Sequence, residues 1–274
     1  MPALFRSLSL LAVLASLTLL APSGAVATDL TAEQWLRAGA EQLTARSALL
    51  ELRLVQTKNG KEREVRLETA TSRRDPKTVK TWILQHTPEI QAGMQFLTLA
   101  TEDGEEQYRY VPVTRAVGRV NPTENFSLFG TDFQIRDISV ADPSEGSHSI
   151  VGTGEVEIGG LDRPVTIVES TYDSGRHRKV VRFLDSEHKL PLRVEYYGKA
   201  GDLEKRLTVL EVKTDASVPV ATHSRMESID RGSATDLFVD SYRFDLDETA
   251  LPESTFTKEH MIEVGKNYDD GSDG

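Results

Sequence analysis

The sequence has 274 residues, of which 43 are acidic and 32 are basic, giving a formal net charge of −11. This acidic balance argues against a nucleic-acid-binding protein, which normally presents a basic surface, and against binding flat on an anionic membrane. The sequence contains no cysteine. It therefore excludes a disulfide framework, a thiolate metal site, a cysteine nucleophile and a lipid-modified N-terminal cysteine.

The first 27 residues have the layout of a secretory signal peptide. Arg6 precedes an apolar run over Leu8–Leu20, and Ala25 and Ala27 form a small-x-small cleavage pattern. A permanent membrane anchor is the alternative, but the run is about 13 residues long, whereas a spanning helix needs about 20. We therefore expect a signal peptide over residues 1–27 and an exported, periplasmic protein that begins near Thr28.

One amphipathic helix is predicted at the start of the mature chain. Thr31 and Gln34 fit a capping box, in which each side chain bonds to a backbone N–H group of the other residue. Apolar residues then recur at helical spacing. This pattern predicts a helix over Ala32–Ala48 with one mainly apolar face.

Beyond this helix the apolar period changes to two, which is typical of β-strands. Asn59-Gly60 stands between two alternating runs and predicts a β-hairpin, because both turn residues accept positive φ. Further strand-like runs are Val79–Gln85, Met94–Ala100, Glu106–Val111, Phe133–Ser139, Ser149–Ile158, Val165–Tyr172, Lys179–Asp185, Leu192–Tyr197, Lys205–Lys213, Thr222–Ile229 and Thr235–Phe244.

The predicted fold class is α+β, mainly β, with a curved antiparallel sheet or barrel, because many short strands are separated by turn residues. No linker or repeat divides the chain. We expect one domain over residues 28–268, followed by a disordered acidic tail over residues 269–274.

The sequence carries no motif for catalysis or metal binding. Its six histidines do not pair at metal-ligand spacing, and it has no nucleophile elbow, phosphate-binding loop or dinucleotide-binding glycine motif. We therefore expect no catalytic residue, no metal and no cofactor, and a protein that is not an enzyme.

Several short motifs follow one another along the mature chain. They are Trp82-Ile83-Leu84 with Pro88 and Gly93, Tyr108-x-Tyr110-x-Pro112, Gly130-Thr131-Asp132-Phe133, Leu190-Pro191 with Glu195-Tyr196-Tyr197, Gly201-x-Leu203-x-Lys205 and Leu251-Pro252 with Phe256. This succession resembles the LolA-like family of outer-membrane lipoprotein-sorting proteins, especially its longer, uncharacterised branch. The resemblance implies an incomplete β-barrel, in which an antiparallel sheet curls around a hydrophobic concavity and helices form a lid. The helix from Ala32 would be one element of that lid.

The resemblance and the strand pattern together predict a concavity that binds a ligand. Its candidate lining residues are Trp35, Leu43, Trp82, Leu84, Phe96, Tyr110, Phe133, Phe183, Tyr196 and Phe244. Ordinary core packing is the alternative for each of them. Arg115 and Arg119 are candidates for contact with an anionic headgroup or a partner protein, with a solvated surface as the alternative.

Two functions fit these expectations. The first is a periplasmic carrier or chaperone that binds acyl chains of lipids or lipoproteins for transport or sorting toward the outer membrane. Its partners would include an inner-membrane exporter or an outer-membrane receptor. The second is an envelope-stress or regulatory sensing module that uses the same fold to bind a lipid or lipoprotein signal. The sequence offers no second apolar segment to tether such a module, which favours the carrier, and we expect a monomer.

Overall fold

The computed structural model describes residues 30–42, 47–75, 77–101, 103–121, 127–138, 146–173, 177–215 and 218–269. The predicted signal peptide, Leu43 and residues 270–274 of the predicted tail lie outside these ranges. The helices are α1 (Ala32–Gln42), α2 (Ile135–Ile138) and α3 (Lys258–Asp269), and the 3-10 helices are η1 (Glu89–Gln91), η2 (Pro112–Thr114), η3 (Leu128–Gly130) and η4 (Glu253–Phe256). None of the described helices is long and apolar enough to cross a membrane.

Thirteen strands in the described ranges form one antiparallel sheet, in the order β6-β5-β4-β3-β2-β1-β13-β12-β11-β10-β9-β8-β7. The strands are β1 (Ser47–Lys58), β2 (Lys61–Ser72), β3 (Thr78–Gln85), β4 (Gln95–Thr101), β5 (Gly104–Val111), β6 (Ala116–Val120), β7 (Ser147–Ile158), β8 (Leu161–Thr171), β9 (Lys179–Asp185), β10 (Pro191–Tyr197), β11 (Leu203–Asp215), β12 (Val218–Ser228) and β13 (Ser233–Phe244).

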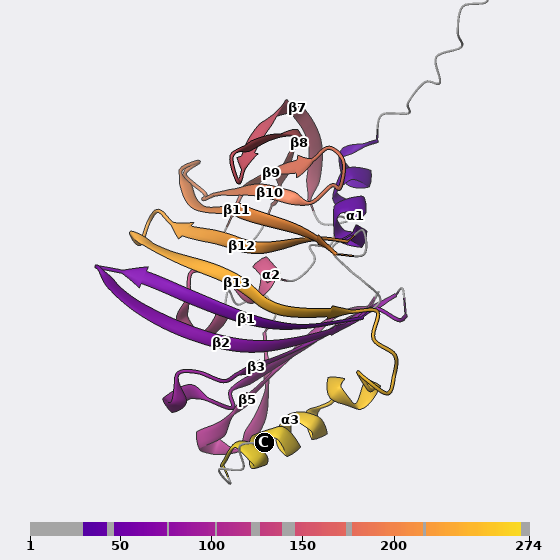
Figure 1. Ribbon diagram of the computed structural model, residues 1–274, viewed down its shortest axis with the longest axis vertical. Coiled ribbons are helices and arrows are strands. Elements are labelled where there is room, and N and C mark those ends of the chain that lie inside the picture. Colours follow the sequence, from indigo (N-terminus) through magenta and orange to yellow (C-terminus); the bar gives the residue numbers. More distant parts are fainter. Residues whose placement is uncertain are drawn as a thin grey trace, which may run out of the picture.

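The sheet consists of two meanders, β1–β6 and β7–β13, which join because the first strand pairs with the last. Leu54 of β1 lies opposite Leu237 of β13. Bulges bend the strands, for example between Glu51 and Leu52, and Figure 1 shows the sheet curling over from β3 to β8. In the described residues β6 and β7 are the two edges and do not pair with each other, so the curl stays open. The predicted incomplete barrel with helices is confirmed.

The predicted hairpin at Asn59-Gly60 is also confirmed. Lys58 lies opposite Lys61, and the two turn residues have φ of 52° and 71°. Positive φ at both positions gives a turn whose twist matches that of the flanking strands.

Two predicted elements differ markedly from the structure. The run Phe133–Ser139 was predicted as a strand, but part of it forms the helical turn α2. The carboxylate of Asp137 accepts a hydrogen bond from the backbone of Gln134 at 2.6 Å, and this contact closes the turn. The predicted first helix ends at Gln42 rather than at Ala48, because Ala48 is already paired with β2.

The start of α1 follows the predicted capping box. The backbone N–H of Thr31 donates to Gln34 Oε1 at 2.8 Å, and that of Gln34 donates to Thr31 Oγ1 at 3.2 Å. The apolar face of the helix buries Ala32 in a small cluster with Val168 of β8 and Leu184 of β9. α1 therefore packs against the second meander.

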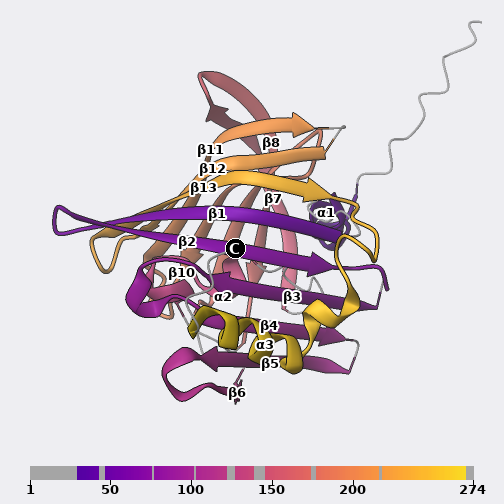
Figure 2. The same cartoon turned by 60° about the horizontal axis from the view of Figure 1, so that its bottom comes forward.

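α3 covers one face of the first meander, as Figure 2 shows. Its Met261 packs with Trp82, Leu84 and Tyr110 in one apolar cluster. The buried side chain of Gln95 links the two layers, since it accepts from Trp82 Nε1 at 2.9 Å and donates to the carbonyl of Met261 at 2.8 Å. We call this side of the sheet the convex face.

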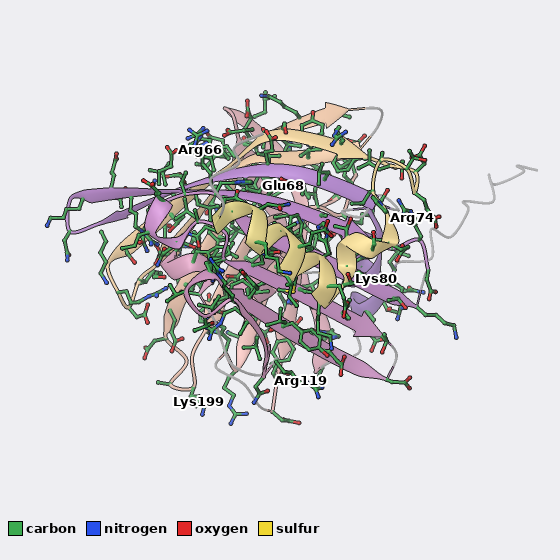
Figure 3. All side chains as sticks on the ribbon, turned by 90° about the horizontal axis from the view of Figure 1, so that it is seen from below. Arg66, Glu68, Arg74, Lys80, Arg119 and Lys199 are labelled. Carbon is green, nitrogen blue, oxygen red and sulfur yellow. The ribbon has the colours of Figure 1, made fainter. Side chains whose placement is uncertain are left out.

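The segment before α3 is held to the convex face by charge. Glu253, the first residue of η4, accepts a hydrogen bond from Lys80 at 2.5 Å and lies 3.4 Å from Arg74. The hydrogen bond from Lys80 lowers the pKa of the Glu253 carboxyl. Figure 3 shows both basic side chains beside η4.

Gly265 allows α3 to approach the sheet closely, and this contact yields a prediction. A Cβ built on Gly265 would overlap ring atoms of Tyr110. We expect Gly265→Ala to lower the free energy of unfolding by about 1–3 kcal/mol through overpacking, although alanine favours a helix by about 1 kcal/mol. Urea denaturation measures the change. Gly118→Ala is the control, because a Cβ at Gly118 has no atom within 4 Å; an unchanged midpoint for Gly265→Ala would contradict the packing.

Candidate functional site

The other side of the sheet carries an apolar cluster that draws on both meanders, and we call it the concave face. Its buried members include Leu54 of β1, Phe96 of β4 and Leu237 of β13, while Tyr196 of β10 and Leu207 of β11 pack against them. Side chains from strands so far apart in the sheet meet only because the sheet curls. The concave face is therefore the hydrophobic interior that a curved sheet must cover or fill.

Residues 127–138, which we call the inner segment, pack against this face. The segment contains η3 and α2, and Figure 1 shows α2 within the curve of the sheet. Leu128, Phe129, Phe133 and Ile135 are all buried in the concave cluster. The protein's own apolar side chains thus fill part of the hollow.

Asp132 fixes the middle of the inner segment to the sheet. Its carboxylate accepts hydrogen bonds from Ser233 at 2.6 Å and Thr235 at 2.8 Å, and it lies 3.2 Å from the guanidinium of Arg231. Burial would raise the pKa of the Asp132 carboxyl, but the hydrogen bonds from Ser233, Thr235 and Ser228 hold that pKa below its ordinary value. The buried group is therefore a carboxylate at neutral pH.

A second buried carboxylate fixes the end of the inner segment. Asp137 of α2 forms an ion pair with Lys205 of β11, and their side chains are 4% and 5% exposed. The Lys205 ammonium also lies 5.3 Å from the ring centre of Tyr196. Burial raises the pKa of Tyr196 well above its usual range, and the neighbouring Asp137 carboxylate adds to this effect. The phenol therefore stays protonated as a hydrogen-bond donor.

Phe129 occupies the hollow in an unusual backbone conformation. Its φ and ψ are 50° and 39°, in the left-handed region that costs a bulky residue about 1–3 kcal/mol. Its ring meets the ring of Phe96 edge to face at 5.4 Å, and its carbonyl accepts a hydrogen bond from Arg63 Nη2 at 2.7 Å. The neighbouring strands thus hold Phe129 in a strained position.

A cavity of about 210 Å³ remains between the inner segment and the first meander. Its lining residues are Arg63, Gln91, Met94, Phe96, Arg109, Ser127, Phe129 and Gly130. Phe96 and Phe129 are buried, whereas the side chain of Arg109 is exposed. The cavity therefore has an apolar floor and a cationic rim. No described side chain of α1 lines it, so the described part of the helix that was expected as a lid does not cover this opening.

The structure brings three of the ten candidate lining residues together on the concave face. Phe96 lines the cavity, and Phe133 and Tyr196 pack in the same apolar cluster. Three others, Trp82, Leu84 and Tyr110, lie on the convex face beneath α3. Ligand contact stays a prediction for all of these residues.

The remaining candidates are dispersed. Trp35 packs where α1 meets β8 and β9, and Phe183 packs with residues of β7–β12. Phe244 stacks on Tyr242 near the end of β13, with ring centres 5.4 Å apart. Leu43 lies outside the described residues.

The two candidate arginines do not line the cavity. Arg115 caps η2 with φ of 50°, and Arg119 forms an ion pair with Glu106 at 3.0 Å. Arg119 lies opposite Tyr108, which packs on the convex face; in Figure 3 it points outward at the lower edge of the molecule. Their contact with a headgroup or partner stays a prediction.

Of the eight residues that line the cavity, sequence reasoning named only Phe96 as a candidate for ligand contact. Arg63 and Met94 alternate in step with Val65 and Phe96, so a period-two argument places them on the concave face. Arg109 lies directly opposite Phe96. Phe129 gave no signal, because its place depends on an irregular segment.

The described residues contain no group of three or more acidic or histidine side chains that could hold a metal ion. One histidine that approaches a carboxylate is His223, which lies 3.0 Å from Asp236, and Arg225 contacts the same carboxylate at 2.7 Å.

Comparison with solved structures identifies the class of fold. A DUF1329 family protein from Desulfovibrio piger ATCC 29098 matches with a TM-score of 0.73 at 20% identity, covering 84% of this chain and 97% of that one. A domain named for outer membrane lipoprotein sorting, from Vibrio parahaemolyticus, matches with a TM-score of 0.73 at 21% identity over 84% and 99%. The LolA superfamily protein NE2245 from Nitrosomonas europaea gives 0.64 at 16% identity over 84% and 99%. The chain has the LolA-like fold, as its motifs predicted.

The family itself is identified by sequence. A family model whose description reads "uncharacterized protein" matches residues 77–263, which is more than half of the chain. The protein belongs to this uncharacterised family. No curated protein matches it in sequence.

The contacts of Asp132 give a stability prediction. Asp132→Asn removes the charge that Ser233, Thr235 and Arg231 share, and hydrogen bonds to a buried charge are worth about 1.5–3 kcal/mol. We expect a loss of unfolding free energy of that order in urea denaturation. The control is Asp240→Asn, which breaks a partly exposed ion pair with Arg53 and costs less than about 1 kcal/mol. Equal losses in the two variants would contradict the role of Asp132.

The same carboxylate predicts a pH dependence. Because the pKa of Asp132 is lower in the folded than in the unfolded protein, its contribution is complete above about pH 4 and declines as the pH falls through the folded-state pKa. The stability difference between wild type and Asp132→Asn should therefore be constant from about pH 7 to 5 and shrink below about pH 4. Urea midpoints measured across this range test it. A stability difference that increases as the pH falls would contradict the lowered pKa of Asp132 in the folded protein.

Proposed function

We propose that this protein is a periplasmic carrier or chaperone that binds acyl chains of lipids or lipoproteins against the concave face of its sheet and moves them toward the outer membrane. The observation that carries the proposal is the apolar concave face, whose hollow the inner segment fills only in part. The likeness to a lipoprotein-sorting domain and to a LolA superfamily protein supports it.

Burial of hydrocarbon supplies the driving force. Each methylene that moves from water into the hollow contributes about 0.8 kcal/mol. A dry cavity of about 150 Å³ holds a molecule the size of benzene, so the cavity of about 210 Å³ accommodates only part of an acyl chain. A longer chain must displace apolar side chains of the inner segment, and Phe129 and Leu128 occupy the position that the ligand would take.

Binding rather than catalysis is the role that this site suits. The described cavity offers apolar rings, two arginines, a glutamine and a serine, with no nucleophile and base within hydrogen-bond reach of each other. We propose that the protein acts as a monomer, receives its cargo from an inner-membrane exporter and delivers it to an outer-membrane receptor.

Phe129 provides a direct test. Phe129→Ala should tighten binding of a fluorescent fatty acid severalfold, because the ligand no longer has to displace the ring from its contact with Phe96. Fluorescence titration of the purified protein measures this. Phe256→Ala is the matched control, since it removes a buried ring from the convex face and should destabilise the protein by about 3–5 kcal/mol without tightening binding.

Two outcomes would overturn the proposal. One is a failure of both wild type and Phe129→Ala to bind the fatty acid, and the other is the absence of any acyl ligand in native mass spectrometry of protein purified from its own envelope. A transfer assay with acceptor vesicles distinguishes the two candidate functions. A carrier would release its bound lipid to the vesicles, whereas a sensing module would retain it.

A further inference from the structure

The charge of the cavity differs from that of the protein as a whole. Among its eight lining residues the two charged ones, Arg63 and Arg109, are both cationic. The chain carries 43 acidic and 32 basic residues, so chance placement would favour carboxylates. A rim of guanidinium groups above an apolar floor suits a ligand that is anionic at one end and apolar at the other.

Strand register places both arginines on the same face as the apolar floor. Arg109 of β5 lies directly opposite Phe96 of β4, and directly opposed residues of antiparallel strands share a face. Arg63 of β2 alternates in step with Val65, which is buried in the concave cluster. The two guanidinium groups therefore reach the cavity from β2 and β5, with β3 and β4 between them.

Arg63 is positioned by the inner segment. Its Nη2 donates to the carbonyl of Phe129 at 2.7 Å. A Cβ on Gly130 would lie 3.0 Å from the same nitrogen, so the absence of a side chain there lets the guanidinium lie along the backbone. A guanidinium has five N–H donors in a planar fork. One bond to a carbonyl leaves donors that match the oxygens of a phosphate or carboxylate.

We propose that this cavity selects amphiphiles with an anionic headgroup, which Arg63 and Arg109 bind at the rim while the acyl chain enters at the apolar floor formed by Phe96 and Phe129. The inference rests on the proposed function and adds the class of ligand. The headgroup lies outside and the acyl chain inside, because Arg109 is exposed and the rings of Phe96 and Phe129 are buried. Arg63 and Arg109 are binding residues for the headgroup.

The test compares lipids that differ only in their headgroup. Lysophosphatidylglycerol and a monoacylglycerol with the same acyl chain are titrated into the purified protein by calorimetry at low ionic strength. We expect lysophosphatidylglycerol to bind roughly tenfold more tightly, which is the size of a charge-assisted hydrogen-bond contribution. The difference in affinity between the two lipids should decrease at high salt, because salt screens the exposed guanidinium group of Arg109. A fatty acid with the same chain should show the same preference through its carboxylate.

Variants assign the preference to the two arginines. Arg109→Gln, at an exposed position, should reduce the preference severalfold, and Arg63→Gln/Arg109→Gln should abolish it. Arg119→Gln is the matched control, because it removes an arginine from the convex face, where it pairs with Glu106. Arg119→Gln should leave the preference for lysophosphatidylglycerol unchanged. The same variant also tests the prediction that Arg119 contacts a headgroup. Urea midpoints confirm that each variant is folded.

Each outcome has one meaning. The inference is overturned if the wild type binds lysophosphatidylglycerol and the monoacylglycerol equally tightly. It is also overturned if the double variant prefers lysophosphatidylglycerol as strongly as the wild type does. Either result leaves the proposed carrier in place. Binding of neither lipid overturns the proposed function as well. Inorganic phosphate is titrated alone, and phosphate that binds as tightly as lysophosphatidylglycerol would show a simple anion site and overturn the selection of amphiphiles.

Discussion

Two buried carboxylates hold the inner segment inside the curl of the sheet, and the cover of the concave face depends on their contacts. Asp132 is bound to β13 and Asp137 to β11, both in the second meander. Arg63 of β2 binds the carbonyl of Phe129 from the first meander. The inner segment therefore connects the two halves of the sheet through polar contacts at fixed positions, which apolar packing alone would not specify.

The two faces of the first meander are closed in different ways. On the convex face α3 lies against the sheet, and Gly265 and the buried Gln95 allow only one close fit. The concave face is covered by an irregular segment that includes a residue with strained φ and leaves a cavity beside it. In the proposed carrier, an acyl chain competes with Phe129 of this irregular cover, because displacing that one residue relieves its backbone strain. On the convex face an acyl chain would have to break a well-packed helix contact.

Two local signals in the sequence predicted the local structure correctly. Asn59-Gly60 specified a hairpin and Thr31 with Gln34 specified a helix start, because each depends on backbone bonds between near neighbours. The side of the sheet that faces the hollow could not be predicted. Both faces of the first meander are covered, so Trp82 and Phe96 look equally apolar although they lie on opposite faces. Phe133–Ser139, which overlaps the inner segment, was predicted as a strand because the residues that anchor Asp132 and Asp137 lie far away in sequence.

The pairing of β1 with β13 also governs how the chain folds. Every strand of the first meander is made before β1 can acquire its second neighbour, since that neighbour is the last strand, β13. Such non-local pairing gives a high contact order and slow folding. Until it forms, one edge of β1 exposes unpaired backbone groups beside the apolar Leu52 and Leu54. Pairing with β13 therefore removes an edge at which the incomplete chain can aggregate.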